Sequence, residues 1–338
     1  MKIAIHHRPG SFSERWIEYC QKNSISYKIV DAFDNDIIQQ VAGCDAFLWH
    51  HHHGQYKDAL TAKRILFALE HAGVNVFPNF NTGWHFDDKV AQKYLLEAIG
   101  APTVPSYVFY DKKDAMEWAK KTSYPKVFKL KGGAGATNVK LVRTQHEALK
   151  LINKAFGKGF PQFDRLNNLK ERYNKYKSGQ DGLLSVAKGA GRLVIPTKFS
   201  QQQSPEKGYA YFQDFIPNDG FDIRVVVING EKAAAEKRFV RENDFRASGS
   251  GKFSYEDINC EVIKESFKIA NKLNLQSVAL DFVINKNVKP LVIEISYGFG
   301  TQGIRNVAGY WEQDLNWYEG NFNPEEWMIE SLIKTMKV

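Results

Sequence analysis

In VALDFVINKNVKPLVIEIS, residues 278–296, two apolar runs each carry one carboxylate. Asp281 lies in the first run and Glu294 in the second, and the pattern predicts a strand hairpin. A carboxylate inside an apolar strand is costly to desolvate unless a charge partner compensates for it. Two carboxylates on neighbouring antiparallel strands also repel each other unless a cation lies between them. Hard oxygen ligands at this spacing suit Mg²⁺, which accepts one or two carboxylates together with substrate phosphates.

Two lysines and a glycine-rich turn precede this hairpin. Lys89 lies on a helix predicted over residues 87–99, and Lys129 ends a strand directly before Gly132-Gly133-Ala134-Gly135-Ala136. Each feature alone has an ordinary explanation, a solvated helix face or a simple turn, and no Gly-Lys-Ser/Thr follows to make a P-loop. Combined with the two carboxylates, they indicate ATP with Mg²⁺ as the occupant, with Mn²⁺ as the alternative ion.

The first hundred residues alternate strands and helices, which predicts a parallel α/β sheet with helices on both faces. The expected strands are 2–6, 26–30, 46–49 and 74–77, and the expected helices are 13–23, 36–41 and 59–71. Ligands collect at the carboxyl ends of the strands in such sheets. Two of these ends carry His6-His7-Arg8 and His50-His51-His52-His53. These histidines allow three hypotheses: they line a pocket for an anionic substrate, they bind a metal ion, or they have a structural role only.

The rest of the chain predicts an α+β arrangement, and Pro102 and Pro105 mark a domain boundary. The domains expected are an N-terminal α/β domain (1–102), a small subdomain (103–215) and a large subdomain (216–338). Expected helices are 87–99, 112–120, 147–155, 163–176, 256–273 and 324–337; expected strands are 106–110, 126–130, 139–142, 209–215, 222–228, 231–238 and a hairpin over 277–295.

The charge of the chain is concentrated in one segment. The formal net charge is +8, and residues 154–207 hold eleven Lys and Arg against four Asp and Glu. No zinc-finger, RNP-type or helix-turn-helix signature accompanies this segment, so a basic insertion over 157–207 is favoured over nucleic-acid binding. Three scattered cysteines exclude a disulfide framework. With no apolar run of membrane-spanning length and no signal-peptide core, we expect a cytoplasmic protein without membrane insertion.

The order of these motifs resembles the ATP-grasp superfamily, and within it the RimK-like branch of ribosomal-protein glutamate ligases. The resemblance covers roughly residues 75–305. It is carried by Lys89, the stretch Lys129–Val139, Gln213-Asp214-Phe215-Ile216, Asp222-Ile223-Arg224, Asn243-Asp244-Phe245-Arg246, and the pair Asp281 and Glu294. It implies an ATP-grasp fold behind an N-terminal parallel α/β domain.

The resemblance also implies roles for individual residues. Lys129, Arg224 and Arg246 are the catalytic candidates, with Arg246 facing the transferred phosphoryl group and Arg224 the acceptor. Asp281, Glu294 and Ser296 are the metal candidates. The candidates for contact with the nucleotide are Lys89, Lys129, Gly132, Gly133, Ala134, Gly135, Gln213, Asp214, Phe215, Asp222 and Arg246.

The chain departs from the family pattern at two places. Ser296 stands where the family usually has Asn, which weakens the second metal position. The basic insertion is longer than the usual connection and is a candidate lid or partner surface. The substrate candidates are His6, His7, Arg8, His50, His51, His52, Tyr297 and Gly298. The aromatic segment 309–319 is expected to pack against the last helix or to form a wall of the acceptor pocket.

The function implied is an ATP-dependent carboxylate–amine ligase that works through an acylphosphate, with surface-polysaccharide or peptide modification as the expected setting. Its partners would be an anionic carboxylate acceptor, small or polymeric, and an amine. A phosphotransferase of the same fold, acting on a small anionic substrate, is one alternative, and an ATP-binding protein that docks on a polyanion is the other. The sequence leaves a homo-oligomer open.

Overall fold

The computed structural model describes residues 1–133, 138–161, 169, 172–173, 176, 182–194, 204–241, 244–285 and 288–336. The chain forms two compact units. Unit 1 comprises residues 1–52, 57–104 and 216–338, and unit 2 comprises residues 53–56 and 105–215. The division into three domains at residues 102 and 215 remains a prediction.

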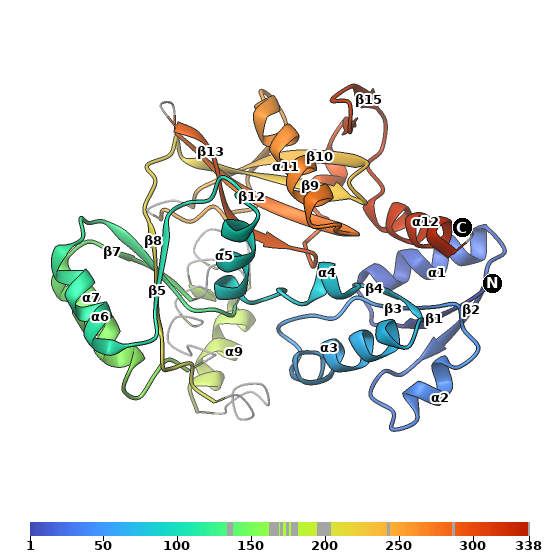
Figure 1. The fold of residues 1–338 in the computed structure, drawn as a ribbon, viewed down its shortest axis with the longest axis horizontal. Helices are drawn as coiled ribbons and strands as arrows, with labels where there is room; N and C mark the ends of the chain where they lie inside the picture. Colours follow the sequence, from blue (N-terminus) through green and yellow to red (C-terminus); the bar gives the residue numbers. More distant parts are fainter. Residues whose placement is uncertain are drawn as a thin grey trace. The chain divides into compact units, whose positions relative to one another are not determined.

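Unit 1 begins with a parallel four-stranded sheet in the order β2-β1-β3-β4. Its strands are β1 (Lys2–His6), β2 (Ser26–Val30), β3 (Ala46–Trp49) and β4 (Asn75–Phe77). Helices α1 (Phe12–Lys22) and α3 (Tyr56–His71) lie on opposite faces of this sheet (Figure 1). Alternate residues of β1 accordingly enter different cores: Ile3 and Ile5 pack with α1, and Ala4 packs with α3. The sheet predicted from the sequence is confirmed.

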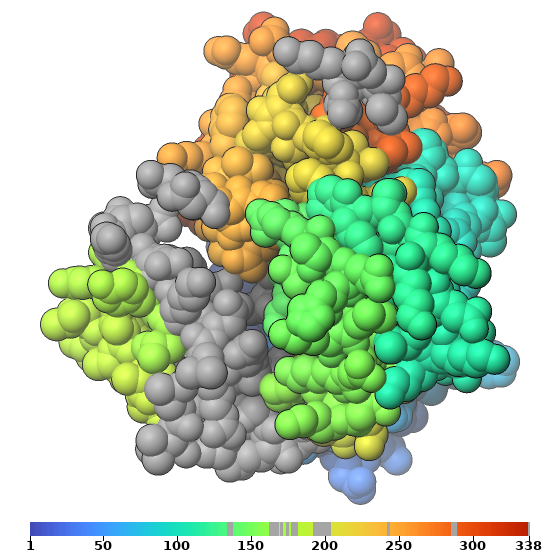
Figure 2. Space-filling model, turned by 90° about the vertical axis from the view of Figure 1, so that its left-hand side faces the viewer, coloured from blue at the N-terminus to red at the C-terminus, as the bar shows by residue number. Residues whose placement is uncertain are grey.

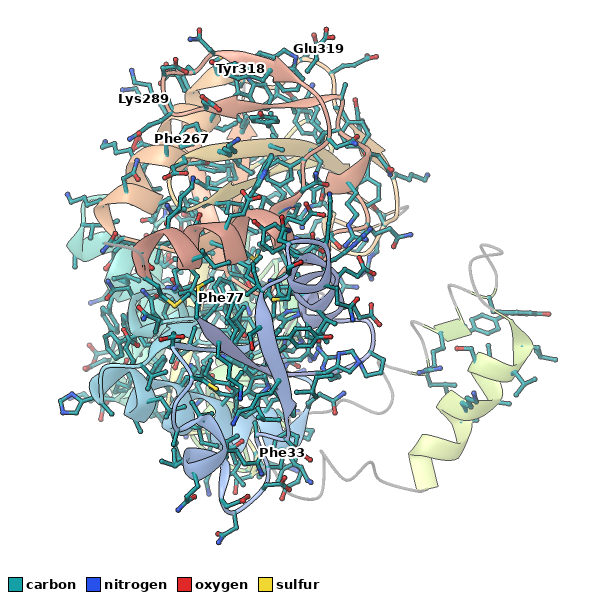
Figure 3. The ribbon with its side chains drawn as sticks, turned by 90° about the vertical axis from the view of Figure 1, so that its right-hand side faces the viewer. Phe33, Phe77, Phe267, Lys289, Tyr318 and Glu319 are labelled. Carbon is teal, nitrogen blue, oxygen red and sulfur yellow. The ribbon has the colours of Figure 1, made fainter. Side chains whose placement is uncertain are left out.

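A larger sheet in unit 1 has the order β13-β12-β9-β10-β14-β15, with β11 (Phe253–Ser254) also paired to β10. Helix α12 (Pro324–Met336) covers one face, and α11 (Cys260–Lys272) with α5 (Lys89–Ala98) covers the other. The strands are β9 (Phe221–Ile228), β10 (Lys232–Phe239), β12 (Ser277–Asn285), β13 (Val288–Ser296), β14 (Gly309–Glu312) and β15 (Trp317–Glu319). Helix α12 packs on α1 as well, so that one core joins both sheets of unit 1; Phe77 lies in it beside α12 (Figure 3).

Unit 2 holds an antiparallel four-stranded sheet in the order β5-β8-β6-β7. Helices α6 (Lys112–Lys121) and α7 (Gln145–Ala155) contact each other and lie on the side of unit 2 that faces the viewer in Figure 2. The strands are β5 (Ser106–Phe109), β6 (Lys126–Lys129), β7 (Val139–Val142) and β8 (Ala210–Asp214). The basic insertion contains α9 (Leu183–Val194), and most of the helix predicted over 163–176 lies outside the described residues.

One helix differs from the sequence-based expectation for a local reason, and the aromatic tail makes the expected contact with the last helix. Helix α11 begins at Cys260 rather than at residue 256, because Asn259 caps it and Asp257 has a positive φ of 51°. The aromatic tail forms a hairpin, β14–β15, in which Tyr310 stacks on Tyr318 with ring centroids 5.8 Å apart and also packs on Trp327 of α12 at 5.0 Å, as expected. Tyr318 and Glu319 lie at the outer edge of unit 1 (Figure 3). Short helices α2 (Ile37–Val41) and α4 (Phe80–Gly83) complete unit 1 together with the 3₁₀ turn η1 (Ile304–Asn306).

Within the described residues, none of the helices combines the length and apolarity needed to cross a membrane.

Gln276 joins the N-terminal part of unit 1 to the start of β12. Its amide nitrogen donates to the Val76 carbonyl at 2.9 Å, and its amide oxygen accepts from the Asn79 N–H at 2.8 Å. We predict that Gln276→Ala lowers the free energy of unfolding by about 2–3 kcal/mol, because both backbone groups lose their partner. Urea denaturation checks this, with the exposed Gln302→Ala as control; equal midpoints for the two variants would contradict it.

Candidate functional site

A row of charged side chains crosses the large sheet of unit 1 at one level. Glu236 on β10 is paired with Arg224 on β9, Arg224 with Asp281 on β12, and Asp281 with Glu294 on β13. Directly paired residues place their side chains on the same face of a sheet. Two residues further along the strands, this face carries Val226 and its apolar neighbours, which enter the core under α12. One sheet face is therefore apolar in one half and charged in the other.

Asp281 is the centre of this row. One oxygen accepts from the Arg224 Nε at 2.8 Å, and the other accepts from the Arg224 Nη2 at 3.0 Å and from the Arg238 Nη2 at 2.8 Å. Burial alone would raise the pKa of the Asp281 carboxyl, but the two guanidiniums outweigh burial and hold that pKa well below its usual range. The carboxylate is therefore ionised at every pH at which the protein would work.

Arg238 is a functional candidate that the sequence analysis missed. It is buried, and besides Asp281 it binds Asp222 through two hydrogen bonds of 2.7 and 2.8 Å. Two arginines and two aspartates thus form a chain of ion pairs, Arg224–Asp281–Arg238–Asp222, in which the formal charges balance. Charged residues alternate with Ile223 in Asp222-Ile223-Arg224 on β9, and Glu236 and Arg238 likewise lie two residues apart on β10. This pattern indicates an ion-pair network only once the pairing of β9 with β10 is known.

Glu236 ends the row and was also missed. It is 3% exposed, and its Oε2 receives no hydrogen bond. Its register partner Arg224 is engaged by Asp281, while Gly303 lies so close that a Cβ there would meet the Glu236 Oε2 at 2.1 Å. Burial raises the pKa of Glu236 to about 7, against the attraction of Arg224 and Arg238.

Glu294 faces a lysine rather than an arginine. The Lys89 Nζ lies 3.1 Å from its Oε1; the lysine side chain is 5% exposed and the glutamate side chain 31%. Asp88 caps α5 by accepting from the backbone of Val90 and Ala91, which fixes the first turn from which Lys89 projects. The predicted nucleotide lysine and the predicted metal-binding glutamate are therefore in contact.

The oxygen donors here are chemically suited to Mg²⁺. Asp281 and Glu294 are paired across β12 and β13, and the Ser296 hydroxyl, which donates to the Gly298 carbonyl at 3.1 Å, keeps its lone pairs. Glu294 is the most accessible donor, because Asp281 already accepts three hydrogen bonds from arginine. Among the described residues, no group of three or more His, Cys, Asp or Glu side chains is arranged to hold a metal ion, so the proposed site would rest on two carboxylates and a hydroxyl.

Arg246 lies on the segment that follows β10. Its guanidinium binds Asp244, with the closest contact, from Nη2, at 2.6 Å, and this hydrogen bonding overcomes burial and lowers the pKa of the Asp244 carboxyl. Nearby, Arg241 donates to the Ser248 carbonyl at 2.9 Å and orders the turn that follows. The segment presents a guanidinium in a fixed orientation.

Unit 2 holds a second set of buried polar contacts, on β6 and β8. The Lys129 Nζ lies 2.6 Å from the Gln213 Oε1, whose amide nitrogen donates to Ser106 at 3.0 Å. Lys126, which the sequence analysis did not select, lies 2.5 Å from Asp214. Both lysines are about 95% buried, and amine groups are rarely held so deeply without a polar ligand or a partner.

The glycine-rich turn follows directly on β6. Gly133 has a φ of +104°, and a Cβ there would meet the Asn138 amide at 2.7 Å, so only glycine fits. Asn138 in turn donates to the Gly132 carbonyl at 3.3 Å and closes the turn. Ala134 and Gly135, the other candidates in this turn, lie outside the described residues.

The histidine runs meet the end of β13 in unit 1. His50 stacks on Phe12 with ring centroids 3.7 Å apart, and the Tyr297 hydroxyl donates to the His51 carbonyl at 2.8 Å. A Cβ on Gly298 would lie 3.6 Å from the His50 Nε2. The structure therefore brings together substrate candidates that are almost 250 residues apart in the sequence.

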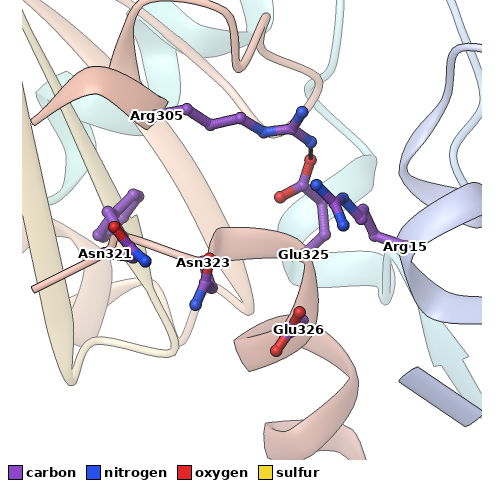
Figure 4. A pocket seen from close by; sticks show the side chains of 7 residues that line it. Arg15, Arg305, Asn321, Asn323, Glu325 and Glu326 are labelled. Carbon is purple, nitrogen blue, oxygen red and sulfur yellow. Dashed lines mark hydrogen bonds and ion pairs between the residues drawn. The ribbon is translucent and has the colours of Figure 1, made fainter. Parts of the chain in front are cut away.

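A separate pocket lies at the start of α12, with a volume of about 170 Å³. Arg15 and Arg305 both point toward the buried carboxylate of Glu325, which Arg305 binds (Figure 4). Its full lining is Arg15, Arg305, Asn321, Phe322, Asn323, Glu325 and Glu326. The sequence analysis selected none of these residues.

Two segments of the chain match family models of ATP-grasp domains. Residues 197–311 match the family model of the RimK-like ATP-grasp domain, and residues 88–178 match that of the ATP-binding domain of the carbamoyl-phosphate synthase L chain. The chain thus carries, over residues 197–311, a segment that matches the RimK-like ATP-grasp domain, the branch that its sequence resembles.

Individual relatives are distant. The α-aminoadipate–LysW ligase LysX of Saccharolobus solfataricus is 22% identical over 273 residues, which cover 80% of this chain and 78% of LysX. A ribosomal protein bS6–L-glutamate ligase of Escherichia coli is 31% identical over 135 residues, 38% of this chain and 45% of the relative. The chain spans 19% of the 2-oxoglutarate carboxylase small subunit of Hydrogenobacter thermophilus, at 28% identity over 88 residues, a quarter of this chain.

Solved structures confirm the fold. A RimK domain ATP-grasp protein from Sphaerobacter thermophilus has a TM-score of 0.59 at 14% identity, covering 98% of this chain and 99% of that one. A D-alanine–D-alanine ligase from Bacillus anthracis has a TM-score of 0.55 at 13% identity, covering 100% and 98%. At these identities the likeness establishes the fold alone.

The buried Glu236 predicts a pH dependence of stability. Its pKa is about 7 in the folded chain against 4.5 unfolded, so the folded state holds the proton more tightly and its advantage is lost as the pH rises through 7. Between pH 5 and pH 8 the wild type should lose about 3 kcal/mol of unfolding free energy relative to Glu236→Gln. Urea denaturation at both pH values measures this, with the exposed Glu256→Gln as control. Parallel pH curves for wild type and Glu236→Gln would contradict the burial argument.

The pocket at α12 predicts a smaller effect. Glu325→Ala should cost about 1–2 kcal/mol of stability, because Arg305 loses its partner but reaches solvent. Glu326→Ala, one position along the helix, should cost less, since Glu326 is more exposed. Thermal unfolding of the two variants tests the order, and a larger loss for Glu326→Ala would refute it.

Proposed function

We propose that this protein is an ATP- and Mg²⁺-dependent ligase that joins a carboxylate to an amine through an acylphosphate. A carboxylate oxygen attacks the γ-phosphorus of ATP, and ADP leaves. The amine nitrogen then attacks the acyl carbon, inorganic phosphate leaves, and the nitrogen loses a proton to give the amide. No covalent enzyme nucleophile is required, so catalysis consists of positioning and charge neutralisation.

The observation that carries this proposal is the charged row Glu236–Arg224–Asp281–Glu294, which lies inside the segment that matches the RimK-like model, together with Lys89, which pairs with Glu294. The ion pairs of Arg224, Asp281, Arg238 and Asp222 support a fixed geometry before any ligand arrives. Such preorganisation is the main source of electrostatic catalysis. At the end of the charged row, the partly exposed Glu294 and the buried Lys89 are the pair that a phosphate group and its cation would rearrange.

Each side chain has a proposed task. Glu294, Asp281 and Ser296 would hold Mg²⁺, which when bound neutralises phosphate charge. Arg224 and Asp222 orient Asp281 directly or through Arg238. Arg246 stabilises the transferred phosphoryl group. In unit 2, Lys129, Gln213, Asp214 and Phe215 would contact the nucleotide, and the backbone of the glycine-rich turn its phosphates.

The substrate is proposed to be anionic. The histidine runs, Arg8, Tyr297 and Gly298 lie at the carboxyl ends of the parallel strands and at the end of β13, where such sheets bind ligands. Arg8 supplies positive charge there. The dependence on ATP supports a cytoplasmic location.

We predict that Glu294→Gln lowers carboxylate-dependent release of ADP about a hundredfold or more, because the accessible metal ligand loses its charge. The assay supplies Mg–ATP, a panel of carboxylates and hydroxylamine, which traps an acylphosphate as a coloured hydroxamate. Glu319→Gln, on the exposed end of β15, is the matched control and should keep wild-type activity.

The same assay separates the proposed reaction from its alternatives. ADP together with hydroxamate supports the ligase. ADP without hydroxamate would indicate a phosphotransferase, and full activity in Glu294→Gln would refute the metal assignment.

A further inference from the structure

The start of the glycine-rich turn is bound by two side chains from the segment that leads into β8. The Lys131 N–H, one residue before Gly132, donates to the Tyr209 hydroxyl at 2.7 Å and to the Glu206 Oε2 at 3.3 Å. The Tyr209 hydroxyl in turn donates to the same Glu206 oxygen. A backbone N–H, a hydroxyl and a carboxylate thus form a continuous chain of hydrogen bonds, and the bonds in such a chain strengthen one another.

Glu206 is itself fixed by the core of unit 2. Its N–H donates to the Phe160 carbonyl at 2.8 Å, and its carbonyl accepts from the Phe160 N–H at 2.9 Å. Gly159 permits this approach, because a Cβ there would meet the Glu206 carbonyl oxygen at 2.6 Å. The Phe160 ring packs on Phe128 of β6, with ring centroids 5.2 Å apart. The buried carboxylate of Glu206 therefore projects from a backbone that is tied to the strand leading into the turn.

A carboxylate at this place acts on the turn and not on a phosphate, because a carboxylate only accepts hydrogen bonds and repels another anion. Gly132 and Gly133 have no side chains to fix them, and glycine adopts many backbone conformations. The direction of their N–H groups therefore depends on how the two ends of the turn are held. Asn138 holds the far end by donating to the Gly132 carbonyl at 3.3 Å. Glu206 and Tyr209 hold the near end.

We propose that Glu206 and Tyr209 are positioning residues for the nucleotide: they orient the start of the glycine-rich turn so that its backbone N–H groups face the β- and γ-phosphates of ATP. This rests on the proposed ligase function and adds the residues that hold its phosphate turn in place. The hydrogen-bonded chain ends on the Lys131 N–H, two residues after Lys129, which is proposed to contact the nucleotide. The sequence analysis selected neither Glu206 nor Tyr209, because their approach to Lys131 follows from the pairing of β6 with β8.

Nucleotide binding in the absence of any carboxylate substrate tests this independently of turnover. Isothermal titration calorimetry gives the affinities of the full-length protein for Mg–ATP and for AMP, which lacks both of the phosphates concerned. Tyr209→Phe should weaken ATP binding about fivefold and leave AMP binding unchanged, because one hydrogen bond to the turn is lost. Glu206→Ala should weaken ATP binding about tenfold or more. Glu206→Gln should lie between Glu206→Ala and the wild type, since an amide oxygen accepts the same hydrogen bonds without the charge.

Tyr124→Phe is the matched control. It removes a tyrosine hydroxyl in the same unit that donates to the Ala119 carbonyl at 2.7 Å, so it loses a hydrogen bond away from the turn and should bind both nucleotides like the wild type.

The proposal is overturned if Tyr209→Phe keeps the wild-type ratio of ATP affinity to AMP affinity, whether both affinities stay the same or both fall by one factor. An equal fall is the result expected of a purely structural role. Tyr209→Phe keeps the test valid where Glu206→Ala does not fold. Failure of the ligase itself shows differently, as absent hydroxamate from a wild type whose affinity ratio still falls on Tyr209→Phe.

Discussion

The site depends on the sharing of one buried carboxylate, that of Asp281, between two guanidiniums. Neither Arg224 nor Arg238 could be buried at this depth without it, and a buried pair broken on one side costs several kcal/mol. Asp222 supplies the second negative charge by accepting a hydrogen bond from the Arg238 Nε. Four charges on three adjacent strands thus fix the spacing of the strands and the direction of every polar group on that face.

This constraint explains why one face of the sheet serves two purposes. Strand alternation sends Val226, Ala234 and Ala279 into the core beneath α12, and the same alternation presents Arg224, Glu236 and Asp281 two residues away. The apolar half anchors the strands on which the charged half is built. At the edge, Lys89 and Glu294 form a simpler pair that remains partly accessible. The fixed part of the row, around Asp281, is therefore distinct from its partly exposed end, at Glu294.

Much of this could be predicted from the sequence, for physical reasons. Periodicity predicted the parallel sheet of unit 1 and nearly all strands, and carboxylates in apolar runs singled out Asp281 and Glu294. The charged residues around them could not be predicted, because the roles of Arg238 beside Asp281 and of Glu236 beside Arg224 follow only from the register of the strands. The capped start of α11 and the hairpin of the aromatic tail depended on local contacts at Asn259 and between Tyr310 and Tyr318.

We propose that the charged row helps to activate a carboxylate as an acylphosphate. The fate of the carboxylate oxygen distinguishes this route from others. With an ¹⁸O-labelled carboxylate substrate, Mg–ATP and hydroxylamine as the amine, mass spectrometry of the inorganic phosphate reports where the phosphoryl group travelled. One labelled oxygen in each phosphate released is the result predicted, because the bond that breaks is between the acyl carbon and that oxygen. Phosphate free of label, formed while the hydroxamate accumulates, would contradict the account.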